Sequence, residues 1–239
     1  MPTSSIIEQI RQCTPALSVG VLTGNWMDFR SDLAILENAG VGLLHIDVMD
    51  GRIWPKITVG TSFVQGVKTA LLKDVHLLID KPECHIESFV KAGADIITFS
   101  VEYCKDIAAT LSTIGRMHNA NDPARGIVKG LSLNPTTPIE KVVPFIKDID
   151  VVVLLAIGPD TGSENFITDL AARIKQIGTL KQDILIFVDG AINKKNITEV
   201  AAMRPDVIVT GSAVFDGKDA DGNLKFMLDA IKRQSHVKI

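Results

Sequence analysis

Residues 44–51 read Leu-His-Ile-Asp-Val-Met-Asp-Gly, an apolar run in which polar side chains occupy alternate positions. This pattern predicts a buried β-strand, in which successive side chains point to opposite faces. His45 and Asp47 then share one face with Met49. An imidazole and a carboxylate are costly to bury among apolar neighbours unless something pairs with them. A metal ion would pair with both, but so would a simple hydrogen bond, and this stretch alone leaves both interpretations open.

A similar pattern recurs along the chain. Seven further runs rich in Val, Ile and Leu end in polar or turn-forming residues. Together they predict eight strands, over residues 16–22, 44–51, 75–80, 96–102, 127–133, 151–157, 184–188 and 207–210. Such branched, apolar strands are typical of parallel sheets that are buried on both faces. Helical spacing predicts connecting helices, among them 62–72, a helix starting at 137–140, and 164–178.

Eight strand–helix units in a chain of 239 residues predict an α/β protein with one domain, a (β/α)8 TIM barrel. An open, doubly wound sheet is the alternative, but it usually has fewer strands and often carries a G-x-G-x-x-G turn, which this sequence lacks. Isoleucines at helical spacing predict that residues 1–15 form an N-terminal helical extension. Residues 16–239 would then form the catalytic barrel.

The composition of the chain argues against nucleic-acid and membrane partners. The net charge is −3, with no basic block or acidic tail, so nothing indicates nucleic-acid binding. The longest apolar runs are far too short to cross a bilayer, and the start lacks the pattern of a signal peptide. Cys13, Cys84 and Cys104 are widely spaced and form no C-x-x-C motif, as expected for reduced thiols. We therefore expect a cytoplasmic protein with no nucleic-acid or membrane partner.

Polar residues at the carboxyl ends of the predicted strands suggest a metal site, because chemistry in such barrels gathers at this end. The candidate ligands are His45, Asp47, His76 and Asp189. Two imidazoles and two carboxylates suit one divalent ion, namely zinc, iron or manganese. Simpler interpretations exist for single residues: His76 would be a core histidine, and Asp189 part of a turn.

The two aspartates suggest a reaction. Asp47 and Asp189 follow strands on different sides of the predicted barrel mouth, so a substrate between them would meet one carboxylate on each face. One carboxylate would remove a proton from a carbon next to a carbonyl, and the other would return a proton to the opposite face. The metal would stabilise the enediolate formed between these steps. The result is epimerisation without a redox cofactor.

Glycine-containing turns after the seventh and eighth strands predict an anion site. Barrels often bind phosphate there through backbone N–H groups. The segments are residues 189–192 and 210–213, which contain Gly190, Gly211 and Ser212. Tight turns with no ligand would explain the same glycines.

These segments resemble the ribulose-phosphate 3-epimerase family from about residue 16 to residue 215. The motifs that carry the resemblance are His-Ile-Asp-Val-Met-Asp-Gly at 45–51, Val-His-Leu-Leu at 75–78, Lys-Ala-Gly-Ala-Asp-Ile-Ile-Thr at 91–98, Leu-Asn-Pro at 133–135, Val-Asp-Gly at 188–190 and Gly-Ser-Ala at 211–213. The resemblance implies a barrel of the pentose phosphate pathway that interconverts D-ribulose 5-phosphate and D-xylulose 5-phosphate. It also implies a homo-oligomer, a metal on the four ligands above, and Asp47 and Asp189 as the acid/base pair.

The chain departs from the family in its recognition segments. Gly20 stands where the family usually has a substrate-contacting serine, and Ser18 lies two residues away from that position. In the loop after the sixth strand only Pro159 and Gly162 match. Ala191 replaces a usual second glycine.

The loop after the second strand also differs, because Trp54-Pro55-Lys56 replaces the family's Val-Pro-Asn. Lys56 is either an added phosphate or carboxylate partner or an exposed cation, and we favour the exposed cation.

The sequence therefore predicts metal-dependent epimerisation at C3 of a ketose phosphate, most simply D-ribulose 5-phosphate. The alternatives are the same mechanism on another ketose or ketose phosphate, and a catalytically idle relative that keeps the metal. The expected substrate contacts are Gly190, Gly211, Ser212, Gly162, Ser18 and Met49.

Overall fold

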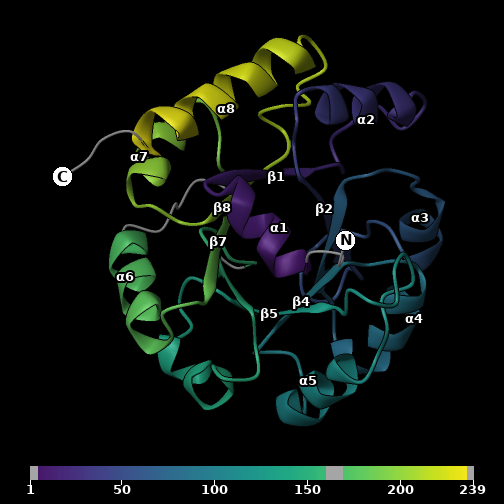
Figure 1. Cartoon of the computed structure of the whole chain (residues 1–239), viewed down its shortest axis with the longest axis vertical. Coiled ribbons are helices and arrows are strands. Elements are labelled where there is room, and N and C mark those ends of the chain that lie inside the picture. Colours follow the sequence, from purple (N-terminus) through teal and green to yellow (C-terminus); the bar gives the residue numbers. More distant parts are fainter. Residues whose placement is uncertain (1–4, 160–168, 236–239) are drawn as a thin grey trace.

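The computed structural model describes residues 5–159 and 169–235 and shows a closed barrel of eight parallel strands (Figure 1). The strands pair in chain order, and β1 closes the ring by pairing with β8. Their bounds are β1 Ala16–Gly20, β2 Leu43–Met49, β3 Leu72–Leu78, β4 Ile96–Ser100, β5 Val128–Leu133, β6 Val151–Leu155, β7 Leu185–Asp189 and β8 Val207–Thr210. The prediction of a single-domain (β/α)8 TIM barrel is confirmed.

Helices surround the barrel, except for α1, which lies over one end (Figure 1), and apolar side chains pack between these surrounding helices and the strands. Their bounds are α1 Ile6–Cys13, α2 Phe29–Asn38, α3 Thr61–Gly66, α4 Ile86–Lys91, α5 Ile107–Gly115, α6 Leu170–Leu180, α7 Ile197–Ala202 and α8 Ala220–Ser235, with 3-10 turns at Pro82–Cys84, Ile139–Lys141 and Val143–Phe145. No helix in the described part of the chain has the length and apolar character of a membrane span.

Two predicted helices are shorter in the structure. The helix expected over 62–72 ends at Gly66, and β3 already begins at Leu72. Glycine favours such an end because it loses more conformational freedom in a helix than other residues. The helix expected to start at 137–140 forms only 3-10 turns, since Pro144 offers no N–H and would clash with a preceding helical turn. The first part of the helix expected over 164–178 lies outside the described residues.

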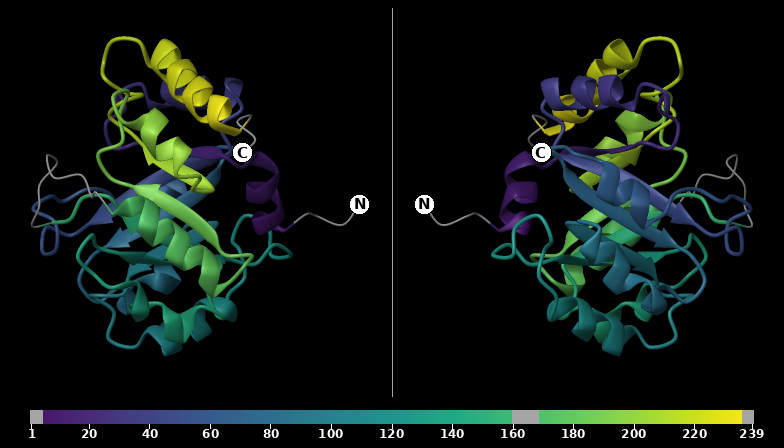
Figure 2. Two further views of the ribbon diagram at one scale, coloured as in Figure 1. Left: turned by 90° about the vertical axis from the view of Figure 1, so that its left-hand side faces the viewer. Right: turned by 90° about the vertical axis from the view of Figure 1, so that its right-hand side faces the viewer.

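Helix α1 closes the end of the barrel at which the strands begin. A capping box between Ser5 and Glu8 starts it, and Ile6 and Ile10 on its inner face are each 1% exposed. These isoleucines join an apolar cluster to which every strand contributes: Ala16, Leu43, Leu72, Ile96, Val128, Val151, Val153, Leu185, Phe187 and Val207. Figure 2 shows α1 at one end of the barrel, opposite the loops that follow the strands. Those loops, at the open end, hold the polar residues predicted above.

Candidate active site

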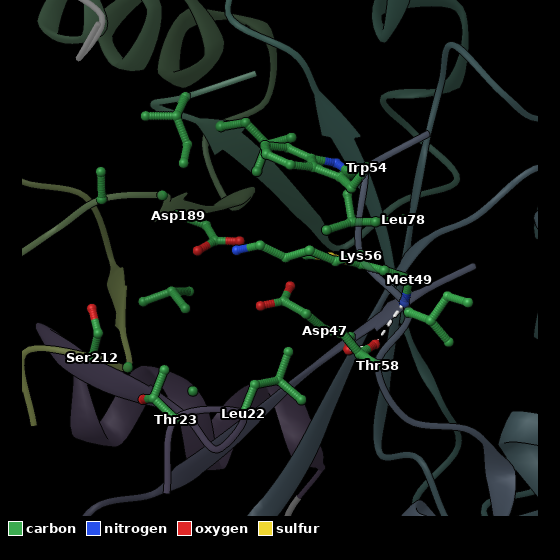
Figure 3. Close-up of a pocket in the computed structure, with 18 residues that line it drawn as sticks. Leu22, Thr23, Asp47, Met49, Trp54, Lys56, Thr58, Leu78, Asp189 and Ser212 are labelled. Atoms are coloured by element: carbon green, nitrogen blue, oxygen red, sulfur yellow. Dashed lines mark hydrogen bonds between the residues drawn. The ribbon is translucent and has the colours of Figure 1, made fainter. Parts of the chain in front are cut away.

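A cavity of about 500 Å³ opens at the carboxyl ends of the strands (Figure 3). Residues of β1, β2, β3, β6, β7, β8 and their loops line it: Gly20, Leu22, Thr23, Asp47, Met49, Trp54, Lys56, Ile57, Thr58, Leu78, Leu155, Ile157, Asp189, Gly190, Ala191, Val209, Gly211 and Ser212. Its volume is within the range of small-molecule sites. The cavity lies where barrel enzymes carry their chemistry.

Four residues predicted as metal ligands meet at the floor of this cavity. Strand register places Asp47 of β2 beside His76 of β3, and β7 brings Asp189 to the same level. Nε2 of His45 lies 3.1 Å from Oδ1 of Asp47 and 3.5 Å from Oδ2 of Asp189. Nδ1 of His76 lies 3.5 Å and 3.3 Å from the same two oxygens. One ligand atom from each residue falls within 4.8 Å of all the others.

The orientation of His45 is fixed from below by Asp74 on β3. Nδ1 of His45 lies 2.7 Å from Oδ2 of Asp74, and the hydroxyl of Ser18 donates to the same oxygen at 2.9 Å. Because a carboxylate accepts, Nδ1 carries the proton and donates. In the neutral ring Nε2 then has a lone pair, which faces the oxygens of Asp47 and Asp189. Such an arrangement of acceptors needs a proton or a cation between them.

Burial and charge shift the pKa values of all four ligands. Burial alone lowers the pKa of His45, but the charges of Asp47, Asp74 and Asp189 outweigh it and hold that pKa well above its usual value. The pKa of His76 is also raised, because the nearby carboxylates of Asp189 and Asp47 outweigh desolvation.

The carboxylates shift in the opposite direction. Burial raises the pKa of Asp47, but the two histidines bring it below its usual value. For Asp189, burial and the charge of Asp47 both raise the pKa, and the histidines again prevail, so that the net shift is downward. The opposite charges of the histidines and the carboxylates therefore stabilise each other.

The donor set fits a divalent metal ion. Neither ring nitrogen of His76 has a hydrogen-bond partner among the described residues, although both are buried. An ion at the cluster would satisfy the nitrogen that faces Asp47 and Asp189. Two imidazole nitrogens and two carboxylate oxygens suit zinc, iron or manganese. Asp74 completes the usual arrangement, since a metal-binding histidine almost always donates its other N–H to a carboxylate, carbonyl or water.

Two glycine-containing turns, which follow β7 and β8, expose main-chain atoms to the cavity. Gly190 and Ala191 follow β7, and Gly211 and Ser212 follow β8, where all four line the cavity. Gly190 has φ +111°, and a Cβ there would approach Cγ1 of Ile157 to 2.8 Å, so a side chain is excluded. Backbone N–H groups exposed in such turns suit an anion.

The remaining predicted contacts have different placements. Met49 lines the cavity, as does Gly20 at the position of the family's serine. Ser18 does not line it, because its side chain is completely buried against Asp74. Gly162 lies outside the described residues. Lys56 is exposed, as expected, and also lines the cavity.

Sequence reasoning missed two residues that support the site. Asp74 was overlooked because β3 was expected to begin at residue 75. Its signal was present, since Asp74 lies two positions before His76 and therefore on the same face of the strand. Thr58 was also missed: its hydroxyl donates to the carbonyl of Asp47 and accepts from the N–H of Met49, both at 2.8 Å. No pattern in the sequence marks this residue.

Comparison with known proteins places these features in context. The sequence model of the ribulose-phosphate 3-epimerase family matches residues 16–215. The ribulose-phosphate 3-epimerase of Bacillus subtilis is 34% identical over 206 residues, which cover 83% of this chain and 91% of that protein. The putative epimerase LsrE of Salmonella paratyphi A is 34% identical over 207 residues, covering 83% and 80%. Among solved structures, 3-hexulose-6-phosphate synthase from Salmonella typhimurium has a TM-score of 0.65 at 17% identity, covering 92% of this chain and 99% of that one, and shows the shared fold.

Proposed function

The chain belongs to the ribulose-phosphate 3-epimerase family and is an epimerase. On that premise, we propose that it interconverts D-ribulose 5-phosphate and D-xylulose 5-phosphate. The observation that carries the proposal is the pair of carboxylates on the cavity floor. Asp47 and Asp189 come from β2 and β7, and both line the cavity. A sugar carbon held between them meets one carboxylate on each face.

The two carboxylates act as base and acid. One, ionised, takes the proton from C3, and the electron pair of the C–H bond moves toward the C2 carbonyl to give an enediolate. The other, protonated, gives its proton to C3 from the opposite face, so the configuration inverts and no electrons are gained or lost. In the reverse reaction the two aspartates exchange roles.

His45 and His76 hold the carboxylates in position from below, in a setting that is nearly closed to solvent. We propose that these four residues bind one divalent ion, whose charge when bound favours the negative charge that develops on the substrate oxygens. Zinc, iron and manganese remain the candidate ions. The substrate phosphate would bind the N–H groups around Gly190, Ala191, Gly211 and Ser212, which line the same cavity.

Proton NMR of D-ribulose 5-phosphate in D₂O tests the proposal. We expect the C3 proton to exchange for deuterium and the signals of D-xylulose 5-phosphate to appear, both dependent on a divalent ion. A protein that is shown to contain metal and that exchanges no C3 proton would refute the activity on this substrate. It would leave a different ketose, or a metal-binding relative without activity.

A second candidate is the same chemistry on another ketose or ketose phosphate. It is favoured by Gly20, which offers no hydroxyl at the family's serine position, and by Lys56, which adds a charge to the cavity. A panel of ketoses with and without phosphate, assayed by C3 exchange, distinguishes the two. We also propose a homo-oligomer, as in the family, and sedimentation velocity would test it.

A further inference from the structure

The loop between β2 and α3 is anchored firmly at both ends. Thr58 bonds to Asp47 and Met49 through its hydroxyl, and its N–H donates to the carbonyl of Met49 at 3.1 Å. At the start of the loop, the carboxylate of Asp50 accepts from the N–H groups of Arg52 and Asp80, each at 2.9 Å. The loop is thereby fixed to the strand that carries Asp47.

Four residues of this anchored loop line the cavity, namely Trp54, Lys56, Ile57 and Thr58, and the first two bear on the inference. The N–H of Lys56 donates to the carbonyl of Trp54 at 2.7 Å, which tightens the turn between them. Figure 3 shows Lys56 extending from the side of Met49 and Thr58 across the cavity, with its ammonium group directed toward Asp189. The indole of Trp54 lies beside this path.

The position of the Lys56 ammonium group matters because few charged side chains line the cavity. Among the described residues that line the cavity, Lys56 is the only one with a positively charged side chain, and Asp47 and Asp189 are the only ones with negative charge. Ser212, which marks the proposed phosphate end, is not the residue toward which Lys56 points (Figure 3). The ammonium group is directed instead toward Asp189, the carboxylate beside which C3 would lie, and this residue directly precedes Gly190 and Ala191 of the proposed phosphate site.

We propose that Lys56 is a substrate-contacting residue whose ammonium group binds the C2 oxygen of the ketose phosphate rather than its phosphate. The inference rests on the proposed function, because it requires a sugar carbon between Asp47 and Asp189. The C2 oxygen becomes negatively charged when the C3 proton is removed, so a cation beside it binds the enediolate more tightly than the ketone. Such a residue affects kcat more than KM.

Two stable ligands separate contact at C2 from contact at phosphate. D-erythronate 4-phosphate carries a carboxylate where the ketose has its C2 carbonyl, and D-erythritol 4-phosphate has a neutral hydroxymethyl group there. Both carry the same phosphate. Calorimetric titration of the zinc-loaded wild type, Lys56→Met and Lys147→Met with each ligand gives six affinities. Lys147 is an exposed lysine just before β6, at the opposite end of the barrel, and controls for the change in net charge.

We expect Lys56→Met to weaken binding of D-erythronate 4-phosphate roughly tenfold to hundredfold, as for a hydrogen bond to a charged group, with little change for D-erythritol 4-phosphate. Lys147→Met should bind both like the wild type, and equal zinc contents exclude an indirect effect. Equal losses for both ligands in Lys56→Met would assign Lys56 to the phosphate and overturn the inference, as would no loss for either. Absence of C3 exchange with D-ribulose 5-phosphate in the zinc-loaded wild type would instead remove the proposed function, and the inference with it.

Discussion

The carboxylate of Asp74 lies 2.7 Å from Nδ1 of His45, and this contact determines which nitrogen of the ring faces the cavity. Both side chains are 1% exposed, so no water competes for the bond. A carboxylate behind a histidine fixes the tautomer and makes the ring a stronger base. Asp74, which does not line the cavity, therefore sets the orientation of a ring that faces it.

Replacing Asp74 tests whether its contact with His45 supports metal binding. We expect Asp74→Asn to weaken zinc binding roughly tenfold to hundredfold, because an amide holds the His45 N–H less strongly than a carboxylate does. Competition with a chromogenic chelator measures the change. Ser18→Ala is the matched control, since it removes the other bond to Asp74 and leaves His45 in place; its effect should be much smaller. Equal zinc affinity in Asp74→Asn and the wild type would contradict this role.

Asp189 can be tested without changing its shape. Asp189→Asn should lower the rate of C3 deuterium exchange roughly hundredfold to ten-thousandfold, because an amide neither accepts nor returns the proton. Circular dichroism should show an unchanged fold. Asp148→Asn, at an exposed position outside the cavity, should exchange at the wild-type rate. Substantial exchange by a metal-loaded Asp189→Asn protein would rule out the two-aspartate mechanism.

The shifted pKa values predict how metal changes stability with pH. In the metal-free protein the pKa values of His45 and His76 are raised. The stability that their protons contribute is complete below the ordinary histidine pKa of about 6.5 and is lost as pH rises through the raised values. The lowered pKa values of Asp47 and Asp189 contribute stability above about pH 4, which is lost as pH falls through those values.

The metal-free protein should therefore melt at lower temperature as the pH rises above neutrality. A bound divalent ion replaces the histidine protons, so the increase in Tm on adding zinc should be larger at alkaline than at mildly acidic pH. Differential scanning fluorimetry with and without zinc measures this. An increase that stays the same across the range would show that the histidines do not exchange protons for metal.

Glycine at position 190 has a measurable steric role. Gly190→Ala should destabilise the protein, because φ is +111° and the new Cβ would lie 2.8 Å from Cγ1 of Ile157. Gly178→Ala is the matched control: this glycine lies within α6, with nothing within 4 Å of the new Cβ. That change should stabilise the protein by roughly 0.5–1 kcal/mol. Urea unfolding compares the two, and a Gly190→Ala protein as stable as the wild type would contradict the argument.

The barrel could be predicted from sequence because its strands are buried on both faces. Runs such as residues 151–157 have almost no polar interruptions, so their number and order were visible without contacts. The predicted ligands are visible for the opposite reason: His45, Asp47 and His76 are polar side chains within apolar runs, and Asp189 ends one. Both signals are local in the chain.

What could not be predicted depends on contacts between distant residues. Lys73 and Asp74 look like the polar end of a loop, yet both are buried inside β3. The ammonium of Lys73 is paired with the carbonyl of Val64, and Asp74 with His45. Neither partner is identifiable until β3 is placed against α3 and β2. The reach of Lys56 into the cavity likewise depends on the anchoring of its loop by Thr58.

The helix that closes the barrel also links the two ends of the described chain. Ile6 and Ile10 leave the ribosome before any strand, but the cluster that buries them includes Val207 of β8. Because every strand contributes to that cluster, the burial of both isoleucines is complete only when β8 is in place. Docking of α1 is therefore coupled to closure of the ring between β1 and β8.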